Sequence, residues 1–68
     1  MARHPGVEEL MKFFAFAHLD DEKQAVSKIF YETAVNLVNT IPKDSAELTM
    51  SLRKLLEAKD CAVRASML

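Results

Sequence analysis

The chain has few of the residues that make turns, cross-links or metal sites. Its 68 residues include one glycine, two prolines, one cysteine and no tryptophan. A single cysteine excludes an internal disulfide framework and a four-cysteine zinc site. So little glycine and proline leaves few turns for an all-β fold, and one glycine cannot form a glycine-rich phosphate loop.

An excess of charge of one sign is also lacking. Nine Lys and Arg face ten Asp and Glu, and the isoelectric point is about 6.1. Non-specific nucleic-acid binding depends on a basic excess, so we expect no duplex nucleic acid partner. No apolar run reaches the roughly 18 residues of a membrane span, and no signal-peptide pattern opens the chain. We therefore expect a soluble intracellular domain with no membrane partner, in which two or three converging cations can still bind a small anion.

Helical periodicity divides the chain into three segments. In the first, Val7–Ala17, the apolar residues have the i, i+3, i+4, i+7 spacing of an amphipathic helix: Val7, Leu10, Met11 and Phe14. A second helix is predicted over residues 21–40 and a third over residues 45–66. The apolar face of the second comprises Val26, Ile29, Phe30, Ala34, Leu37, Val38 and Ile41, and that of the third Leu48, Leu52, Leu55, Leu56, Ala62 and Val63.

Capping signals mark the starts of the two long helices. Asp21 with Gln24, and Asp44 with Glu47, have the spacing of a capping box. Pro42 stops the second helix. Because a short connection makes the long helices antiparallel neighbours, we expect one all-α domain over residues 1–68, a short N-terminal helix followed by an antiparallel αα-hairpin. Since so small a core supplies little net stability, we also expect a homo-oligomer.

Lys59 lies in the middle of the apolar stripe of the third predicted helix. A projection at 100° per residue places it close to Leu48 and Leu52, and lysine is rarely buried without a partner. Either its stem packs on the leucines while the ammonium reaches water, or it points into a pocket between subunits and binds an anion.

Several aromatic residues lie off the predicted apolar faces. Phe13 and Phe16 lie on the other side of the first helix from Val7 and Leu10, and Tyr31 lies off the main face of the second. Exposed aromatics at several points predict a second hydrophobic surface. Such a surface serves either self-association or the stacking of a ligand's bases, and a pocket between subunits combines both.

The sequence contains no recognisable catalytic motif. The sequence has no nucleophile and base pair, and His4, His18 and Cys61 lack a metal-binding spacing, so we expect no enzyme. His18 at the junction of the first two helices is either an ordinary junction residue or part of a ligand site. Lys28 and Arg64, on polar helix faces, are either solvated surface charges or contacts to an anion.

Three motifs together resemble a known family. They are the aromatic-x-His opening Phe16-Ala17-His18, the turn Pro42-x-x-Ser45-x-Glu47 and the Leu/Ala-rich stretch from Ser51 to Ala65. Over about residues 13–65, the chain resembles the helical-hairpin domain of small phage proteins that sponge cyclic-nucleotide signals. Members of this family counter the CBASS and Thoeris bacterial immune systems.

The resemblance implies sequestration without catalysis in the host cytoplasm. Members are homo-oligomers, often hexamers, that hold cyclic di- or trinucleotides, or cyclic ADP-ribose isomers, between protomers; here the first ligand class is favoured. The segment around Arg64 is similar to a family stretch whose arginine contacts phosphates, and an aromatic residue and a cation of the second helix complete the family's contacts. The predicted ligand-binding residues are Phe13, Phe16, His18, Lys28, Lys59 and Arg64. The alternative is a helical adaptor that binds another protein and no small molecule.

Overall fold

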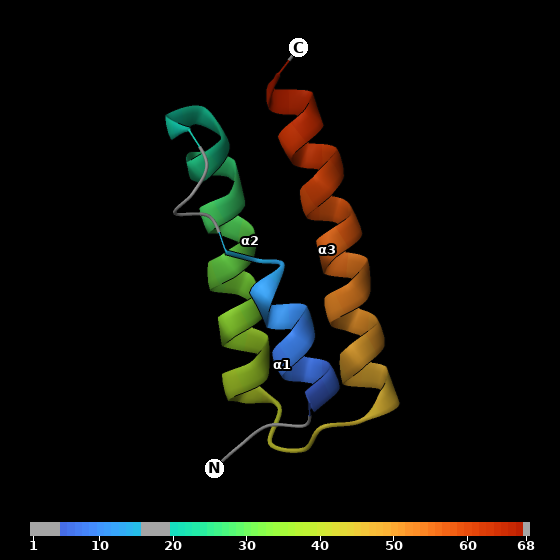
Figure 1. The fold of residues 1–68 in the computed structure, drawn as a ribbon. Helices are drawn as coiled ribbons and strands as arrows, with labels where there is room; N and C mark the ends of the chain where they lie inside the picture. Colours follow the sequence, from blue (N-terminus) through green and yellow to red (C-terminus); the bar gives the residue numbers. More distant parts are fainter. Residues whose placement is uncertain (1–4, 16–19, 68) are drawn as a thin grey trace.

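The computed structural model describes residues 5–15 and 20–67, which form three helices and no strand (Figure 1). They are α1 (Pro5–Lys12), α2 (Asp21–Thr40) and α3 (Ala46–Ser66). The prediction of an all-α protein is confirmed. The long helices α2 and α3 lie side by side and run in opposite directions, joined by residues 41–45, and α1 lies against the half of α3 next to this connection (Figure 1).

Both long helices begin one residue away from the predicted capping boxes. Asp20 is the N-cap of α2, and its carboxylate accepts a hydrogen bond of 3.1 Å from the N–H three residues further on. Ser45 caps α3 in the same way, with its hydroxyl as acceptor at 3.1 Å. The cap is the residue that is still extended while its side chain reaches the first turn. The predicted boxes at Asp21 and Asp44 are therefore wrong by one position.

The first helix is shorter than the predicted helix Val7–Ala17. It begins at Pro5, because proline suits the first helical turn, where its missing N–H is not needed, and it ends at Lys12. The N–H groups of residues 13–15 then bond to carbonyls three residues back, at 3.0 to 3.3 Å, as in a tightened last turn. The rest of the predicted helix, residues 16–17, lies outside the described residues.

A small apolar core lies where α1 meets the two long helices. The six buried apolar side chains are those of Val7, Leu10, Phe14, Ala34, Leu48 and Leu52. The predicted apolar faces of the first and third helices supply most of them, and Phe14 is completely buried, as its place in the pattern predicts. These residues hold α1 on α3 because the two helices present their apolar stripes to each other.

The second helix buries a narrower stripe than predicted. Ser27 and Ala34, two turns apart on one line of α2, are completely buried, whereas Ile29 is 64% exposed. Placing Ile29 on the buried face was wrong, because it lies well round the helix from this line. A helix that packs mainly against one neighbour buries only the side chains facing that neighbour.

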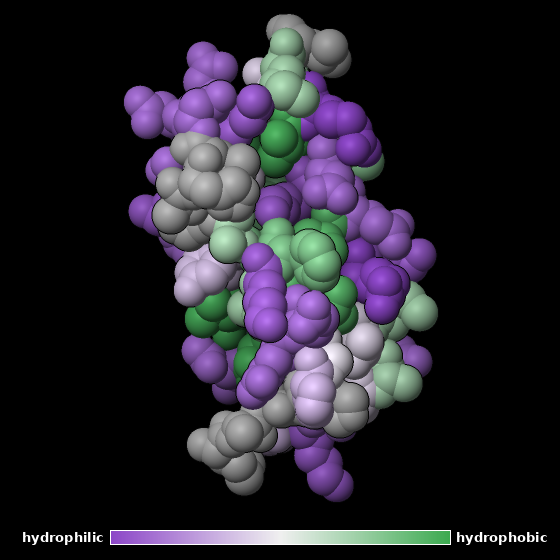
Figure 2. All heavy atoms as spheres, viewed as in Figure 1, coloured by the Kyte–Doolittle hydropathy of each residue, from purple (hydrophilic) through white to green (hydrophobic). Residues whose placement is uncertain are grey.

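Exposed hydrophobic side chains are scattered along the described part of the chain. The large ones are Phe13, Ile29, Tyr31, Met50 and Met67. On the face shown in Figure 2, hydrophobic side chains reach the surface in separate spots among hydrophilic ones. None of the described helices has the length and hydrophobicity to cross a bilayer.

Candidate functional site

A cavity of about 360 Å³, which we call the polar cavity, lies beyond the C-terminal end of α1 and between α2 and α3. Its lining residues are Lys12, Phe13, Ser27, Lys59, Asp60, Val63 and Arg64. Three of them, Phe13, Lys59 and Arg64, belong to the predicted ligand site. The volume is at the lower end of the roughly 300–1,000 Å³ typical of small-molecule pockets. Three separate elements therefore bring an aromatic ring and cations to one place.

Lys59 is the buried cation of this cavity. Its side chain is only 8% exposed, and the ammonium donates a hydrogen bond to the backbone carbonyl of Phe13. The ammonium also lies 5.9 Å from the centre of the Phe14 ring, within the range of a cation–π contact. Instead of extending along α3 to the surface, the side chain turns toward the end of α1, where a positive charge stabilises free carbonyls.

The charge of Lys59 is incompletely compensated. None of the ion pairs among the described residues includes it, and an ammonium has three donors, of which the Phe13 carbonyl takes one. Burying a cation without an anionic partner is costly. The remaining donors are therefore suited to an anion that enters the polar cavity.

Arg64 and Lys12 add two more cations at the rim. The Arg64 guanidinium donates to the sulfur of Cys61 at 3.4 Å, and no ion pair of the described residues includes it. Lys12 makes an exposed pair with Glu9 at 3.5 Å. Against three cations the cavity has one carboxylate, that of Asp60, so its lining favours an anionic ligand.

Phe13 provides an apolar, aromatic wall at the opening of the cavity. Its side chain is 56% exposed, although Phe14, the next residue, is completely buried in the core. A ring held at the edge of a cationic cavity can stack on the face of a heterocyclic base. The prediction that Phe13 lies off the apolar face of the first helix is confirmed by its exposure.

The structure does not bring Lys28 to the cavity. Lys28 points to solvent and lies 3.8 Å from the carboxylate of Glu32, with both side chains about 60% exposed. This is the arrangement of an ordinary surface charge. Phe16 and His18 lie outside the described residues.

Sequence reasoning missed Ser27. It is completely buried, lines the polar cavity, and its hydroxyl has no hydrogen-bond partner in the described part of the molecule. Ser27 lies two turns before Ala34, on the same line of the predicted helix as this apolar residue. A polar side chain buried on that line needs a hydrogen-bond partner, and this is the signal that could have identified it.

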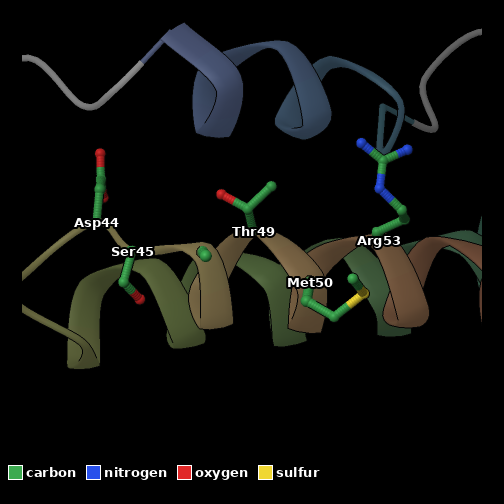
Figure 3. A pocket seen from close by; sticks show the side chains of 6 residues that line it. Asp44, Ser45, Thr49, Met50 and Arg53 are labelled. Atoms are coloured by element: carbon green, nitrogen blue, oxygen red, sulfur yellow. The ribbon is translucent and has the colours of Figure 1, made fainter.

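A second, larger hollow of about 550 Å³ lies along the first turns of α3. Its lining residues are Asp44, Ser45, Ala46, Thr49, Met50 and Arg53 (Figure 3). Figure 3 shows the side chains of Thr49 and Arg53 of α3, and of Asp44 in the connection before it, extending to one side, with Met50 on another. None of these residues is buried as a whole, although one carboxylate oxygen of Asp44 has no contact with water, so the hollow is an open groove along α3.

Metal-ligating side chains do not cluster among the described residues that line the two hollows. Among residues 5–15 and 20–67, no three His, Cys, Asp or Glu side chains are grouped so that they could hold a metal ion. The polar cavity presents hydrogen-bond donors and cations with a single exposed carboxylate. This is the chemistry of binding an anion.

The motifs that carry the family resemblance are described only in part. The aromatic-x-His opening lies outside the described residues. In the turn, Ser45 is the N-cap of α3 and Glu47 lies in its first turn, which is the geometry of any capped helix. Comparisons of the chain with protein-family models, curated proteins and solved structures found no match.

Proposed function

We propose that this protein sequesters a cyclic di- or trinucleotide without transforming it, and that it does so as a homo-oligomer of helical hairpins. The observation that carries the proposal is the buried Lys59 ammonium, unpaired with any carboxylate of the described residues, in a cavity that Phe13 and Arg64 also line. A nucleotide presents a phosphate anion and the face of a base. A charged donor and an aromatic ring are the complements of these two groups.

The small size of the core and of the cavity supports the proposed oligomer. Six buried apolar side chains form the core, and below about 70–80 residues a single core supplies only roughly 3–5 kcal/mol. The polar cavity is small for a molecule with two or three nucleotides, and Phe13 stands exposed at its edge. A second protomer would cover Phe13 and enlarge the site. The family resemblance suggests that the ligand is an immune signal of CBASS-type defence and that the assembly is a hexamer.

A release experiment tests sequestration against catalysis. The protein is incubated with cyclic di-AMP, cyclic di-GMP or cyclic GMP-AMP, separated from free nucleotide and heat-denatured, and the released material is analysed by chromatography. We expect one of these ligands to return intact. A converted product would indicate an enzyme, and no uptake of any of the three would remove the proposal.

Two arginines of α3 provide a matched test of the site. Arg64 lines the polar cavity, whereas Arg53 lies in the open groove. Arg64→Ala should weaken binding of the retained cyclic nucleotide by roughly 10- to 100-fold, the loss of a charged hydrogen bond. Arg53→Ala should bind as the wild type does. Equal losses in the two variants would mean that only net charge matters.

Light scattering tests the assembly separately. A folded monomer at micromolar concentration would remove the homo-oligomer and, with it, a ligand held between protomers.

An adaptor function remains the second candidate because Ile29 and Met50, 64% and 49% exposed, do not line the polar cavity. A stable oligomer that takes up no cyclic nucleotide, and whose protein partner is lost on Ile29→Lys, would favour the adaptor.

A further inference from the structure

We infer that the hydroxyl of Ser27 is a specificity-determining contact that donates a hydrogen bond to a phosphate oxygen of the ligand in the polar cavity. This inference rests on the proposed function and adds to the site a residue for which neither the sequence pattern nor the resemblance gives a role. Ser27 is completely buried, lines the cavity and has no hydrogen-bond partner among the described residues. Buried hydroxyl groups nearly always have a partner, so the partner of this one is to be sought in the cavity.

Three other helical hydroxyls show what Ser27 does not do. Ser51, Ser66 and Thr33 each donate to a carbonyl of the preceding turn, at 2.7 to 2.8 Å. This local bond satisfies a serine or threonine inside a helix without any tertiary contact. Ser27 makes no such bond, although it also lies inside a helix.

The neighbours of Ser27 determine the kind of ligand atom that it meets. Lys59 and Arg64, both of α3, line the same cavity as Ser27 of α2 and supply further donors there. A phosphate group has several oxygens that point in different directions and can accept hydrogen bonds from donors on two helices. A phosphodiester of a cyclic nucleotide can thus be held from both helices at once.

Two serine variants test this assignment. Ser27→Ala removes the hydroxyl with little change in volume, and Ser51→Ala, outside the cavity, removes a hydroxyl that bonds to its own helix. Affinity for the cyclic dinucleotide retained in the release experiment is measured by calorimetry, and stability by thermal unfolding. We expect Ser27→Ala to lose roughly tenfold or more in affinity, as for a hydrogen bond to a charged group, with an unchanged or higher melting temperature. Ser51→Ala should bind as the wild type does.

The outcomes separate this inference from the proposed function. Unchanged affinity in Ser27→Ala would overturn the inference and indicate that the ligand does not contact the hydroxyl, while sequestration would stand. A clearly lower melting temperature alongside the lower affinity would overturn it by giving Ser27 a structural role. If none of the cyclic dinucleotides binds, the proposed function fails, and inorganic phosphate is titrated by NMR instead. Phosphate-dependent shifts at residue 27 that vanish in Ser27→Ala would support the Ser27 contact, and no shifts would overturn it.

Discussion

The two ends of the α2–α3 pair differ in what they bury. Next to the 41–45 connection, the buried side chains are apolar, among them Leu48 and Leu52 of α3. Toward the other end, the same two helices bury Ser27 and Lys59, which are the buried polar side chains of the described residues. We call these parts the apolar end and the polar end. Since buried polar groups without full partners lower stability, the polar end contributes less to holding the helices together than the apolar end does.

The length of α1 explains this difference. Its eight residues span about 12 Å, whereas the 21 residues of α3 span about 31 Å. α1 therefore covers only part of the groove between α2 and α3 (Figure 1), and the polar cavity opens where α1 ends. Lys59 lies at this boundary, because its ammonium bonds to the carbonyl of Phe13 just after α1.

The largest expected effect comes from two adjacent phenylalanines on either side of the boundary. Phe14→Ala empties a completely buried site and should lower the free energy of unfolding by about 3–5 kcal/mol. Phe13→Ala removes a ring that is more than half exposed, so the free energy of unfolding should change by about 0.5 kcal/mol or less. The same variant should weaken nucleotide binding. Urea unfolding and calorimetry measure the two effects. If both variants lose similar stability, Phe13 belongs to the core and not to the cavity.

A second pair compares the two ends directly on α3. Leu52→Ala, at the apolar end, should cost about 2–5 kcal/mol of unfolding free energy because the site is completely buried. Val63→Ala, at the polar cavity, should cost about 1 kcal/mol or less, because Val63 is only partly buried beside a hollow. Chemical denaturation measures both. Equal losses would mean that the two ends are packed alike and that the hollow is closed in solution.

Lys59→Met tests the contact that joins the two ends. The variant keeps an unbranched apolar side chain but leaves the Phe13 carbonyl without its donor, so we expect a loss of about 1–3 kcal/mol. The control is Lys54→Met, which removes an exposed lysine lying 3.9 Å from Glu57 and should cost less than about 1 kcal/mol. Unfolding free energies measure both changes. A more stable Lys59→Met protein would show that the burial of the charge costs more than its hydrogen bond contributes.

The smallest effect concerns the caps of the two long helices, which differ in their response to pH. At the polar end, the hydrogen bond from the backbone N–H of Lys23 holds the pKa of Asp20 below its ordinary value of 3.8 against the opposing effect of desolvation, and a hydrogen bond and the charge of the Lys23 side chain lower it further. Ser45, at the apolar end, caps α3 with a hydroxyl that does not titrate.

Because the pKa of Asp20 is lower in the folded than in the unfolded state, its stabilising effect is present above pH 4 and is lost as the pH falls through the lowered pKa. Asp20→Asn keeps a capping side chain that has no charge to lose. Its stability should therefore fall less than that of the wild type as the pH falls from 5 to 2. Ser45→Ala should cost about 1 kcal/mol at every pH in this range. Thermal unfolding across the range measures the three proteins. Parallel curves for wild type and Asp20→Asn would contradict the role of the carboxylate.

Local patterns predicted much of what the structure describes. Spacing alone placed Phe14 in the core and Lys59 on the buried stripe of α3, because both depend on the period of one helix. The caps were displaced by a single residue, since Asp20 and Asp21 are both good capping residues and only the backbone geometry selects one of them.

Of the residues that line the polar cavity, the pattern singled out Phe13 and Lys59, which stand out on their helix faces, and the resemblance singled out Arg64. The pattern missed Ser27, and it placed Ile29 on the wrong face. Both errors have one cause, because the line along which α2 meets its neighbours is a property of the packed helices and not of α2 alone.

The sequence by itself determined that the described residues are mostly helical, where the two long helices begin and end to within one residue, and which side of α3 turns inward. These features depend on contacts between residues close in the chain, so periodicity and capping chemistry predict them. Only the tertiary structure decided that Lys59 reaches the carbonyl of a residue 46 positions away and that Ser27 is buried beside it at the polar cavity. The reason is geometric: a cavity between helices depends on how far α1 extends and on how α2 and α3 face each other.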